Sequence, residues 1–388
     1  MAVAEWAFWC SLFVILYTYF GYPLIIILAA KLRRRHARSS SHGIVSDAEL
    51  PTVNVIFAAH NEAPYIARKL ENCQRLDYPA EKLRILVGSD GSTDGTNEIA
   101  ASIKSDRIEF VAFNPRSGKM ATVNRLVRMA DGDVCVFTDV SELFDPDAIR
   151  RLVVHFDDPK VGLVAGNHIY NSKSSGIGVG TRIYRQFLEN LDRAETKVCS
   201  VFTCHGPIYA CRRALYPFPP DNTINDDVAV PWSILSQGHR MVFEPAAVVR
   251  GDVLPATNKF FRQKVRCQAG KYQNFSQFPR LFIPWPPLRW WIFVSRCVLP
   301  TVVPWMLLVA LFTNVALLFA AKPLYLALFV VQAAFYLASV IGLAAEVVNI
   351  RTRALSLPFY FVTANVGSMF GFISFLLRIQ RAAWRRVE

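Results

Sequence analysis

Four long apolar stretches lie near the two ends of the chain, and a mixed polar and apolar segment separates the first from the other three. The first runs from Trp6 to Ala30. The other three cover roughly Val298 to Ala320, Leu324 to Val347 and Leu355 to Leu377. At about 1.5 Å of rise per residue, a helix of each length can cross a hydrocarbon core of about 30 Å. The pattern predicts membrane segments at both ends.

The charges beside these stretches predict how the chain is oriented. The first stretch is followed by basic residues at Lys31, Arg33, Arg34, Arg35 and Arg38. A cleaved signal peptide would carry its positive charge before the apolar stretch, so we expect a retained anchor. By the positive-inside rule, the basic cluster and the central domain lie in the cytosol.

The same rule creates a difficulty at the C-terminal end. Three crossings from a cytosolic domain would leave Arg378, Arg381, Arg385 and Arg386 on the outside. Either one of the three C-terminal segments is re-entrant or interfacial, or the rule fails here. A segment that mixes aromatic residues and cations, Phe260 to Tyr272, precedes them and predicts an amphipathic interface helix. A basic flank that only orients the next helix is the plainer alternative.

The middle of the chain alternates short apolar strands with helical stretches. Strands at Val53–Ala59 and Leu83–Gly88 each end in a polar turn that leads into a helical stretch. This alternation predicts a mostly parallel α/β sheet, in which ligands bind beyond the carboxyl ends of the strands. Each polar turn alone also fits plain turn chemistry, because Asp-Gly-Ser sequences favour turns.

A third strand end carries acidic and hydroxyl side chains. The strand from Asp133 runs into Asp139, Val140, Ser141 and Glu142. Mg²⁺ is usually held by one or two carboxylates together with substrate phosphates, so Asp139 is placed to bind a metal. Capping of a following helix is the alternative explanation. Lys119, which follows a glycine, is a candidate phosphate contact.

Two adjacent carboxylates, Asp226 and Asp227, open a later helical segment. Their mutual repulsion can raise the pKa of one carboxyl group and suit it to act as a base. An acidic first turn favoured by the helix dipole is the structural alternative.

The net charge of +13 is consistent with membrane segments, because much of the excess lies beside the apolar stretches. That placement favours a membrane and argues against nucleic acid as a partner. The eight cysteines form no CxxC pair and no zinc spacing, which is typical of small buried side chains in a reducing compartment.

The order of these motifs resembles the membrane-bound inverting glycosyltransferases of family 2, which include hyaluronan, chitin and cellulose synthases. The resemblance covers nearly the whole chain. Five elements match in order: Ala59 to Glu62, Asp90, Asp139, Asp226–Asp227 and Gln263 to Cys267. It implies a GT-A-type, Rossmann-like α/β domain. With the membrane segments, it implies an anchor at 1–35, a transferase domain at 50–255, interface helices at 256–296 and a membrane region at 297–388.

The resemblance also implies the roles of these residues. Ala59, Glu62, Asp90, Lys119, Asp139, Gln263 and Arg266 would bind the nucleotide-sugar donor, expected to be a UDP-sugar, with Mg²⁺ or Mn²⁺ at Asp139. Asp227, beside Asp226, would be the catalytic base. His205, Gly206 and Cys267 would line the acceptor site, although a structural turn explains the first two equally well.

Three departures from the family pattern bear on the product. The metal-binding DxD is Asp139-Val140-Ser141, so Ser141 or Glu142 would have to replace its second acid. The Glu-Asp pair is Asp226–Asp227, and the tryptophan of QxxRW is Cys267. The resemblance predicts transfer, with inversion, to a growing polysaccharide or glycan. The loss of the tryptophan favours the alternative, a single addition to a lipid acceptor such as a polyprenyl-linked sugar or ceramide.

We therefore expect an integral protein of a bacterial plasma membrane with a cytosolic catalytic domain. A non-catalytic membrane protein with a degenerate domain is the remaining hypothesis, which sugar-nucleotide turnover would exclude. The sequence identifies neither the sugar nor the acceptor and makes no prediction of an oligomeric state.

Overall fold

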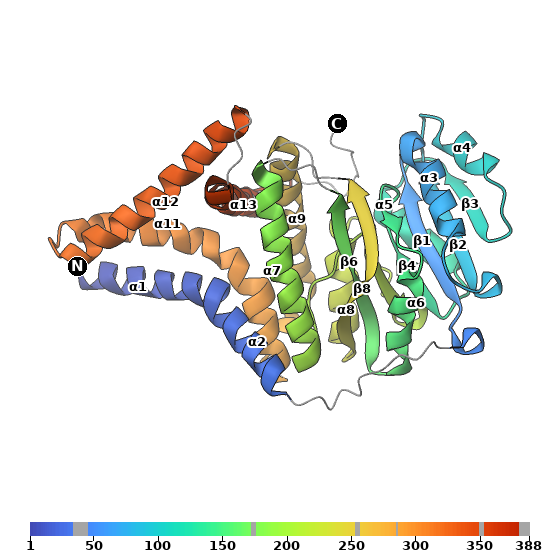
Figure 1. The fold of residues 1–388 in the computed structure, drawn as a ribbon, viewed down its shortest axis with the longest axis horizontal. Coiled ribbons are helices and arrows are strands. Elements are labelled where there is room, and N and C mark those ends of the chain that lie inside the picture. Colours follow the sequence, from blue (N-terminus) through green and yellow to red (C-terminus); the bar gives the residue numbers. More distant parts are fainter. Residues whose placement is uncertain (34–45, 172–175, 253–256, 285, 349–352, 380–388) are drawn as a thin grey trace.

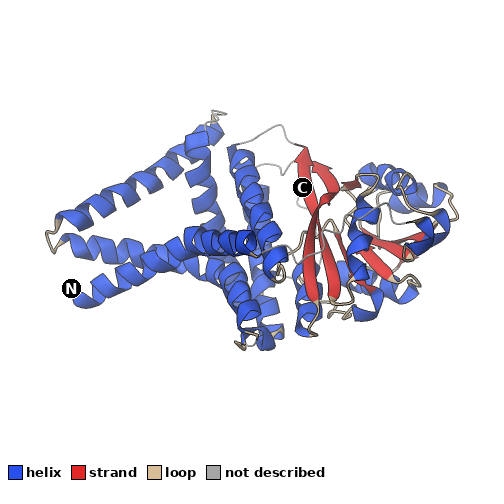
Figure 2. Ribbon diagram, turned by 60° about the horizontal axis from the view of Figure 1, so that its bottom comes forward, coloured by secondary structure: helices blue, strands red, loops and turns tan. Residues whose placement is uncertain are grey.

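The structure is a computed structural model that describes residues 1–33, 46–171, 176–252, 257–284, 286–348 and 353–379. Most of the basic residues used to predict the orientation lie outside these ranges: Arg34, Arg35, Arg38, Arg381, Arg385 and Arg386. Figure 2 shows strands gathered in one half of the molecule and long helices in the other.

One mixed sheet forms the centre of the polar half. Its strands, in the order in which they lie side by side, are β3 (Ile108–Phe113), β2 (Leu83–Asp90), β1 (Val53–Ala59), β4 (Val134–Phe137), β7 (Tyr209–Arg212), β6 (Val161–Asn171), β8 (Arg240–Asp252) and β5 (Leu143–Phe144). The first four are mutually parallel, whereas β7 is antiparallel to both β4 and β6. The predicted strand–helix alternation therefore gives the parallel half of the sheet.

Helices cover both faces of this sheet, and each face has its own apolar core. The helices are α3 (Ala63–Gln74), α4 (Thr96–Ser102), α5 (Lys119–Met129), α6 (Ala148–Val153), α7 (Gly176–Val198) and α8 (Asp226–Ser236). Residues of α3 and α6 enter the core on one face, and residues of α5, α7 and α8 enter the core on the other. This arrangement confirms the predicted α/β fold class.

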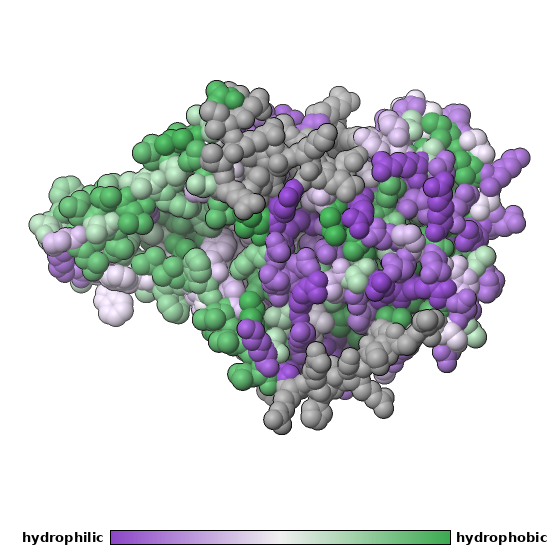
Figure 3. Space-filling model, viewed as in Figure 1, coloured by the Kyte–Doolittle hydropathy of each residue, from purple (hydrophilic) through white to green (hydrophobic). Residues whose placement is uncertain are grey.

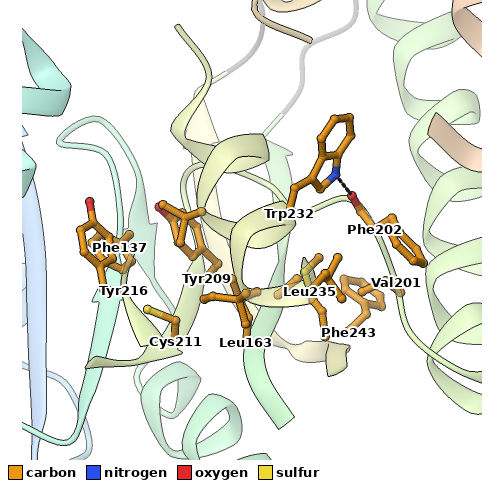
Figure 4. Packing of buried hydrophobic residues seen from close by; sticks show 14 of the residues in the cluster. Phe137, Leu163, Val201, Phe202, Tyr209, Cys211, Tyr216, Trp232, Leu235 and Phe243 are labelled. Atoms are coloured by element: carbon orange, nitrogen blue, oxygen red, sulfur yellow. Dashed lines mark hydrogen bonds between the residues drawn. The ribbon is translucent and has the colours of Figure 1, made fainter. Parts of the chain in front are cut away.

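Trp232 of α8 is fully buried in the core on the face of α5, α7 and α8. Its indole Nε1 donates to the carbonyl oxygen of Phe202 at 3.0 Å, and its ring packs edge-on against Phe293. Figure 4 shows Trp232 and Phe202 beside Phe243 and Leu235 in the same cluster. Since Phe293 belongs to a long apolar helix outside the sheet domain, this core joins the two halves of the molecule.

The apolar half consists of α1 (Ala2–Leu16), α2 (Tyr22–Leu32), α10 (Pro287–Phe293), α11 (Leu299–Leu318), α12 (Pro323–Val347) and α13 (Arg353–Leu376). By length and composition, four helices of the described chain are able to cross a membrane: Ala2–Leu32, Pro287–Leu318, Pro323–Glu346 and Ala354–Leu376. These correspond to the four apolar stretches of the sequence. Their exposed side chains form the apolar surface at one end of the molecule (Figure 3).

Two π-helical turns lie where the apolar helices meet the sheet domain. One spans Tyr17–Gly21 between α1 and α2, and the other spans Val294–Val298 between α10 and α11. The Tyr17 hydroxyl lies 2.9 Å from Ser295 Oγ and accepts a hydrogen bond of 2.7 Å from the indole of Trp291. The two irregular turns are thus bonded to each other.

The remaining long helix, α9 (Thr257–Gln277), contains the segment predicted as an amphipathic interface helix. The structure confirms that this segment is helical, and α9 packs between the sheet domain and α13. Figure 1 shows α7 and α9 crossing the molecule between its two halves.

Candidate active site

The turns that follow β1 and β2 are bonded to each other. His60 Nδ1 lies 2.8 Å from the carbonyl oxygen of Asp90, and Asn61 Oδ1 accepts a bond of 2.9 Å from the Thr93 amide. Asn61 has a φ of 54°, a left-handed conformation that asparagine tolerates better than most residues. The two strand ends therefore form one connected surface.

The carboxylate of Asp90 is buried and holds the loop that precedes α5. Its oxygens accept hydrogen bonds from the backbone amides of Ser117, at 2.6 Å, and Gly118, at 2.9 Å. Gly118, with a φ of 99°, adopts a conformation that favours glycine and leads directly into Lys119. Asp90 thereby sets the position of Lys119, whatever contact it makes with a nucleotide.

Lys119 lies between two of the predicted site carboxylates. Its ammonium nitrogen is 3.0 Å from Asp139 Oδ1 and 3.4 Å from Asp226 Oδ2. Burial would lower the pKa of Lys119, but Asp139 and Asp226 outweigh it and raise that pKa. In turn, the lysine outweighs the effect of burial on Asp139 and lowers the pKa of its carboxyl group. At neutral pH, the cation and at least the Asp139 carboxylate are charged.

Asp227 has the opposite shift. Burial, together with the adjacent Asp226, raises its pKa to about 7, against the opposing effects of Lys119 and Arg266. A carboxyl group with a pKa near the working pH is suited to accept a proton and release it again. The Cys204 thiol donates to the Asp227 carbonyl oxygen at 3.0 Å, and a Cβ at Gly206 would lie 3.5 Å from Asp227 Oδ2. The loop around residue 205 therefore lies directly against the candidate base.

Three contacts dock α9 onto the start of α8. The Asn225 side chain donates to the carbonyl oxygen of Cys267 at 2.7 Å, and a Cβ at Gly270 would overlap Asn225. Gln273 Oε1 accepts from the backbone amide of Ile224 at 3.0 Å. These contacts bring Arg266 near the paired aspartates, although the two lie far apart along the chain.

Arg266 faces the same acidic cluster as Lys119. Burial opposes its charge, but Cys267, Asp227, Asp226 and Asp139 together raise the pKa of the guanidinium. Gln263, one helical turn earlier, and Arg266 both keep contact with solvent on α9, but only the arginine carries a charge that these carboxylates stabilise. Arg266 is therefore the residue of the motif that the fold directs at the carboxylates.

A buried lysine outside the sequence motifs holds the loop around Asp139 by hydrogen bonds. Lys69 of α3 is fully buried and donates to Thr138 Oγ1 at 2.9 Å and to the carbonyl oxygen of Glu142. Its ammonium lies 4.2 Å from the centre of the Phe144 ring, and burial lowers its pKa to about 8. In the sequence, Lys69 looks like any lysine of an amphipathic helix.

Glu142 is already engaged with β6. Its Oε2 lies 2.8 Å from His168 Nε2, and Ser141 Oγ donates to its other oxygen at 3.3 Å. To replace the second acid of DxD, Glu142 would have to leave His168. Asp226, and not Glu142, is the carboxylate that shares the Lys119 ammonium with Asp139.

Among the described residues, no group of three or more His, Cys, Asp or Glu side chains is arranged to hold a metal ion alone. Asp139 and Asp226 nevertheless share one cation, the Lys119 ammonium, so the space between them accommodates positive charge. This donor set fits a divalent ion that takes its remaining oxygen ligands from a diphosphate, the usual manner of binding for Mg²⁺.

The other predicted site residues lie at the same edge of the sheet. Ala59 is buried at the end of β1, and the Glu62 amide donates to Thr96 Oγ1 at 2.9 Å. Burial, together with Arg185 and His168, lowers the pKa of His205 well below its usual value, which keeps this imidazole neutral. His205 and Gly206 occupy a tight turn that closes on Ile208.

A parallel half-sheet extended by antiparallel strands, with carboxylates at its edge, is the arrangement of a GT-A-type fold. Residues 54–216 match the family model described as glycosyl transferase family 2. This segment therefore belongs to that family, which confirms the resemblance seen in the sequence. The match ends before Asp226 and α9.

Related proteins point the same way. The chain is 29% identical over 231 residues to the poly-beta-1,6-N-acetyl-D-glucosamine synthase of Staphylococcus aureus, covering 58% of this chain and 56% of that protein. With the synthase of the same name from Staphylococcus epidermidis, the identity is 24% over 227 residues, or 57% and 55% of the two chains. The matched region thus spans little more than half the length of these relatives.

One solved structure has the same fold along nearly the whole chain. It is the mannosyltransferase PcManGT from Pyrobaculum calidifontis in complex with GDP-Man and Mn²⁺, with a TM-score of 0.74 and 24% identity. The similarity covers 95% of this chain and 99% of that one, so it includes the apolar helices as well as the sheet domain.

Proposed function

We propose that the chain is a membrane-embedded inverting glycosyltransferase that takes a sugar from a nucleoside-diphosphate donor. The observation that carries this proposal is the Lys119 ammonium between Asp139 and Asp226, beside Asp227, whose pKa is raised. The family match, the staphylococcal polysaccharide synthases and the GDP-Man complex of the structural neighbour all support sugar transfer.

In the proposed reaction, Asp227 takes the proton of the acceptor hydroxyl as that oxygen attacks the anomeric carbon from the face opposite the diphosphate. The bond to the diphosphate then breaks with inversion. Lys119 and Arg266 hold the leaving diphosphate, whose negative charge increases as the bond breaks. Asp90 acts at a distance, because it fixes the loop that carries Lys119.

A divalent ion, Mg²⁺ or Mn²⁺, would be held by Asp139 with Asp226 and the diphosphate. When bound, it would stabilise negative charge on the leaving group. Mn²⁺ accompanies GDP-Man in the structural neighbour, which supports the use of a divalent ion with a nucleotide sugar here. Lys119 would then move from the carboxylates to the phosphate oxygens.

For the acceptor, we propose a growing glycan, as the names of the staphylococcal relatives imply. One observation favours a second candidate, a single addition to a lipid-linked acceptor. Cys267 stands beside Arg266 on α9, and its thiol offers no aromatic ring on which an acceptor sugar could stack. We further propose that the sheet domain faces the cytosol.

A binding experiment tests the donor site separately from the acceptor. Calorimetric titration of the purified full-length protein with uridine, guanosine and cytidine diphosphates, in Mg²⁺, is expected to show binding of at least one, with the uridine nucleotide preferred. Lys119→Met should weaken that binding. If none of the three nucleotides binds, the proposed donor site is wrong.

Removal of the metal should stop the reaction. We expect excess EDTA to abolish transfer and added Mg²⁺ or Mn²⁺ to restore it. Asp139→Asn should abolish transfer even when the metal is added, because the ion loses its protein carboxylate. Asp145→Asn is the matched control, since Asp145 follows in the same acidic segment but pairs with Arg250 at 2.7 Å. Full activity in EDTA would instead assign the charge stabilisation to Lys119 and Arg266 without a metal.

The shape of the cation at position 266 should matter as well as its charge. A guanidinium binds phosphate oxygens through two parallel bonds, whereas an ammonium acts as a point charge. We therefore expect Arg266→Lys to impair transfer substantially, and Arg262→Lys, an exposed arginine one turn earlier on the same helix, to leave it unchanged. Equal rates for the two variants would leave Arg266 with no role beyond orienting α9.

Product length in the same assay tests Cys267. We expect short or single-sugar products from the wild-type protein, sized by gel or mass spectrometry. Cys267→Trp restores the indole that the polymerising members of the family carry and should lengthen them. High-molecular-weight polymer from the wild-type protein would exclude the single addition and support the growing glycan as acceptor.

A further inference from the structure

We propose that α13 lies along the membrane surface on the side of the sheet domain and is not a fourth membrane crossing. Its apolar stripe would be immersed in the nearer lipid leaflet. The chain would then cross three times, by α1–α2, α10–α11 and α12. This inference does not depend on the proposed sugar transfer.

The direction of α13 differs from that of the other apolar helices. In Figure 1, α1 and α11 extend along the long axis of the molecule, away from the sheet domain, and α12 runs obliquely to it, whereas α13 is seen nearly end-on beside α7. A helix viewed end-on there runs across that long axis. If α1 and α11 run roughly along the membrane normal, α13 runs close to the membrane plane.

The contacts of α13 also keep it beside the basic helix α9. Tyr360, near the start of α13, packs against Phe260 with ring centres 5.3 Å apart, and Phe372 near its end packs at 4.9 Å from Tyr272. Between these points, a Cβ at Gly367 would lie 3.2 Å from the Lys264 side chain. The two helices are therefore in contact over most of their length.

This contact limits how deep α13 can go. The neighbouring α9 carries Lys259, Arg262, Lys264, Arg266 and Lys271, and Arg266 faces the acidic cluster of the sheet domain. Cations cost several kcal/mol in the centre of a bilayer, so α9 stays at or above the headgroups. A helix that follows α9 for most of its length remains at a similar depth and has too few residues left to reach the far side.

The free face of α13 fits a lipid leaflet. Val366, Phe370, Ile373 and Leu377 follow one another at helical spacing and are 38%, 53%, 42% and 64% exposed. They lie roughly a third of a turn around the helix from Gly367 and Gly371, which face α9, and Phe370 at the edge of the stripe meets Phe261 of α9 edge-on at 5.8 Å. The stripe is apolar and exposed, like the outer faces of the membrane helices, so hydrocarbon chains are the occupant that we assign to it.

The charges at the chain ends agree with three crossings. The N-terminal end of α1 and the turn between α11 and α12 lie at the same end of the molecule, where Lys322 pairs with Glu5 at 2.7 Å. The C-terminal end then falls on the side of the sheet domain. In that topology, Arg378 and the basic residues after it in the sequence share a side with Lys31 and Arg33, as the positive-inside rule requires.

Paired protease sites in the full-length protein test this topology. One variant carries a cleavage site directly after Arg33, at the end of α2, and a second after residue 388. The matched variant carries the first site in the turn between α11 and α12 and keeps the second. Both are reconstituted into sealed vesicles and treated with a protease that cannot cross lipid, so that only sites on the outer side are cut, whatever the mixture of orientations.

We expect doubly cut molecules from the first variant and none from the second. Doubly cut molecules from the second variant and none from the first would show that α13 crosses the membrane and would overturn the proposal. Detergent, which should expose every site in both variants, confirms that each site can be cut. Loss of sugar transfer would not affect either result, so failure of the proposed function is distinguishable.

Discussion

Replacement of Asp227 by asparagine is expected to lower the rate of sugar transfer about a hundredfold or more, the usual effect of losing a general base. Asparagine keeps the size of the side chain but cannot accept the proton of the acceptor hydroxyl. Donor binding should remain nearly intact, because Lys119, Asp139 and Arg266 are unchanged. Initial rates and calorimetry of the donor nucleotide measure the two quantities separately.

The pH dependence gives a second readout for the same residue. The pKa of Asp227 is raised to about 7, and a base works only when it is deprotonated. The value of kcat/KM for the wild-type protein should therefore fall as the pH drops below about 7, and the residual rate of Asp227→Asn should lack this decrease. Loss of nucleotide binding in Asp227→Asn would contradict the assignment and make Asp227 a donor-site residue.

Removal of the Arg296 guanidinium should produce the largest loss of stability. Arg296 lies in the π-helical turn Val294–Val298, with Nη2 at 2.7 Å from Asp192 Oδ1 and Nε at 3.2 Å from Glu195 Oε1. All three side chains are buried, and Tyr22 of α2 also donates to Glu195 at 2.6 Å. Breaking such a buried pair leaves uncompensated charge and costs about 3–5 kcal/mol.

Arg296→Met should therefore lower the thermal unfolding midpoint of the purified protein in detergent well below that of the wild type. The control is Arg193→Met, which removes the exposed pair with Glu189 on the same helix α7. Exposed pairs contribute about 0–1 kcal/mol, so this variant should unfold close to the wild type. Similar midpoints for the two variants would show that the buried cluster does not hold the membrane helices to the sheet domain.

The parallel half of the fold was predictable because its signal is local. Each strand of β1, β2 and β4 is a short apolar run that ends in polar residues, and parallel strands bring those ends to one edge. The placement of Asp139 near Lys119 follows from that rule together with the family resemblance. The paired aspartates were visible for the same reason, as an acidic start to a helix.

The parts that the sequence did not reveal depend on contacts between distant segments. The amide of Asn225 holds α9 to α8 through a backbone carbonyl, and any residue type can supply such an acceptor. Lys69 differs from a surface lysine only because α3 buries it under the Asp139 loop, where it bonds to Thr138. Likewise, apolar composition cannot separate a crossing helix from one held at the surface, since α13 differs from α12 in its direction and neighbours.

The central claim is that the cluster around Lys119, Asp139 and Asp227 transfers sugar from a nucleotide donor. Its most direct measurement is a radiolabel screen in which purified full-length protein in lipid, with Mg²⁺ and Mn²⁺, receives a panel of labelled nucleotide sugars and membrane-lipid or glycan acceptors. We predict labelled product from at least one donor, with release of an equal amount of nucleoside diphosphate. The absence of product and of released nucleotide across the panel, from a protein that binds the donor nucleotide, would contradict the claim.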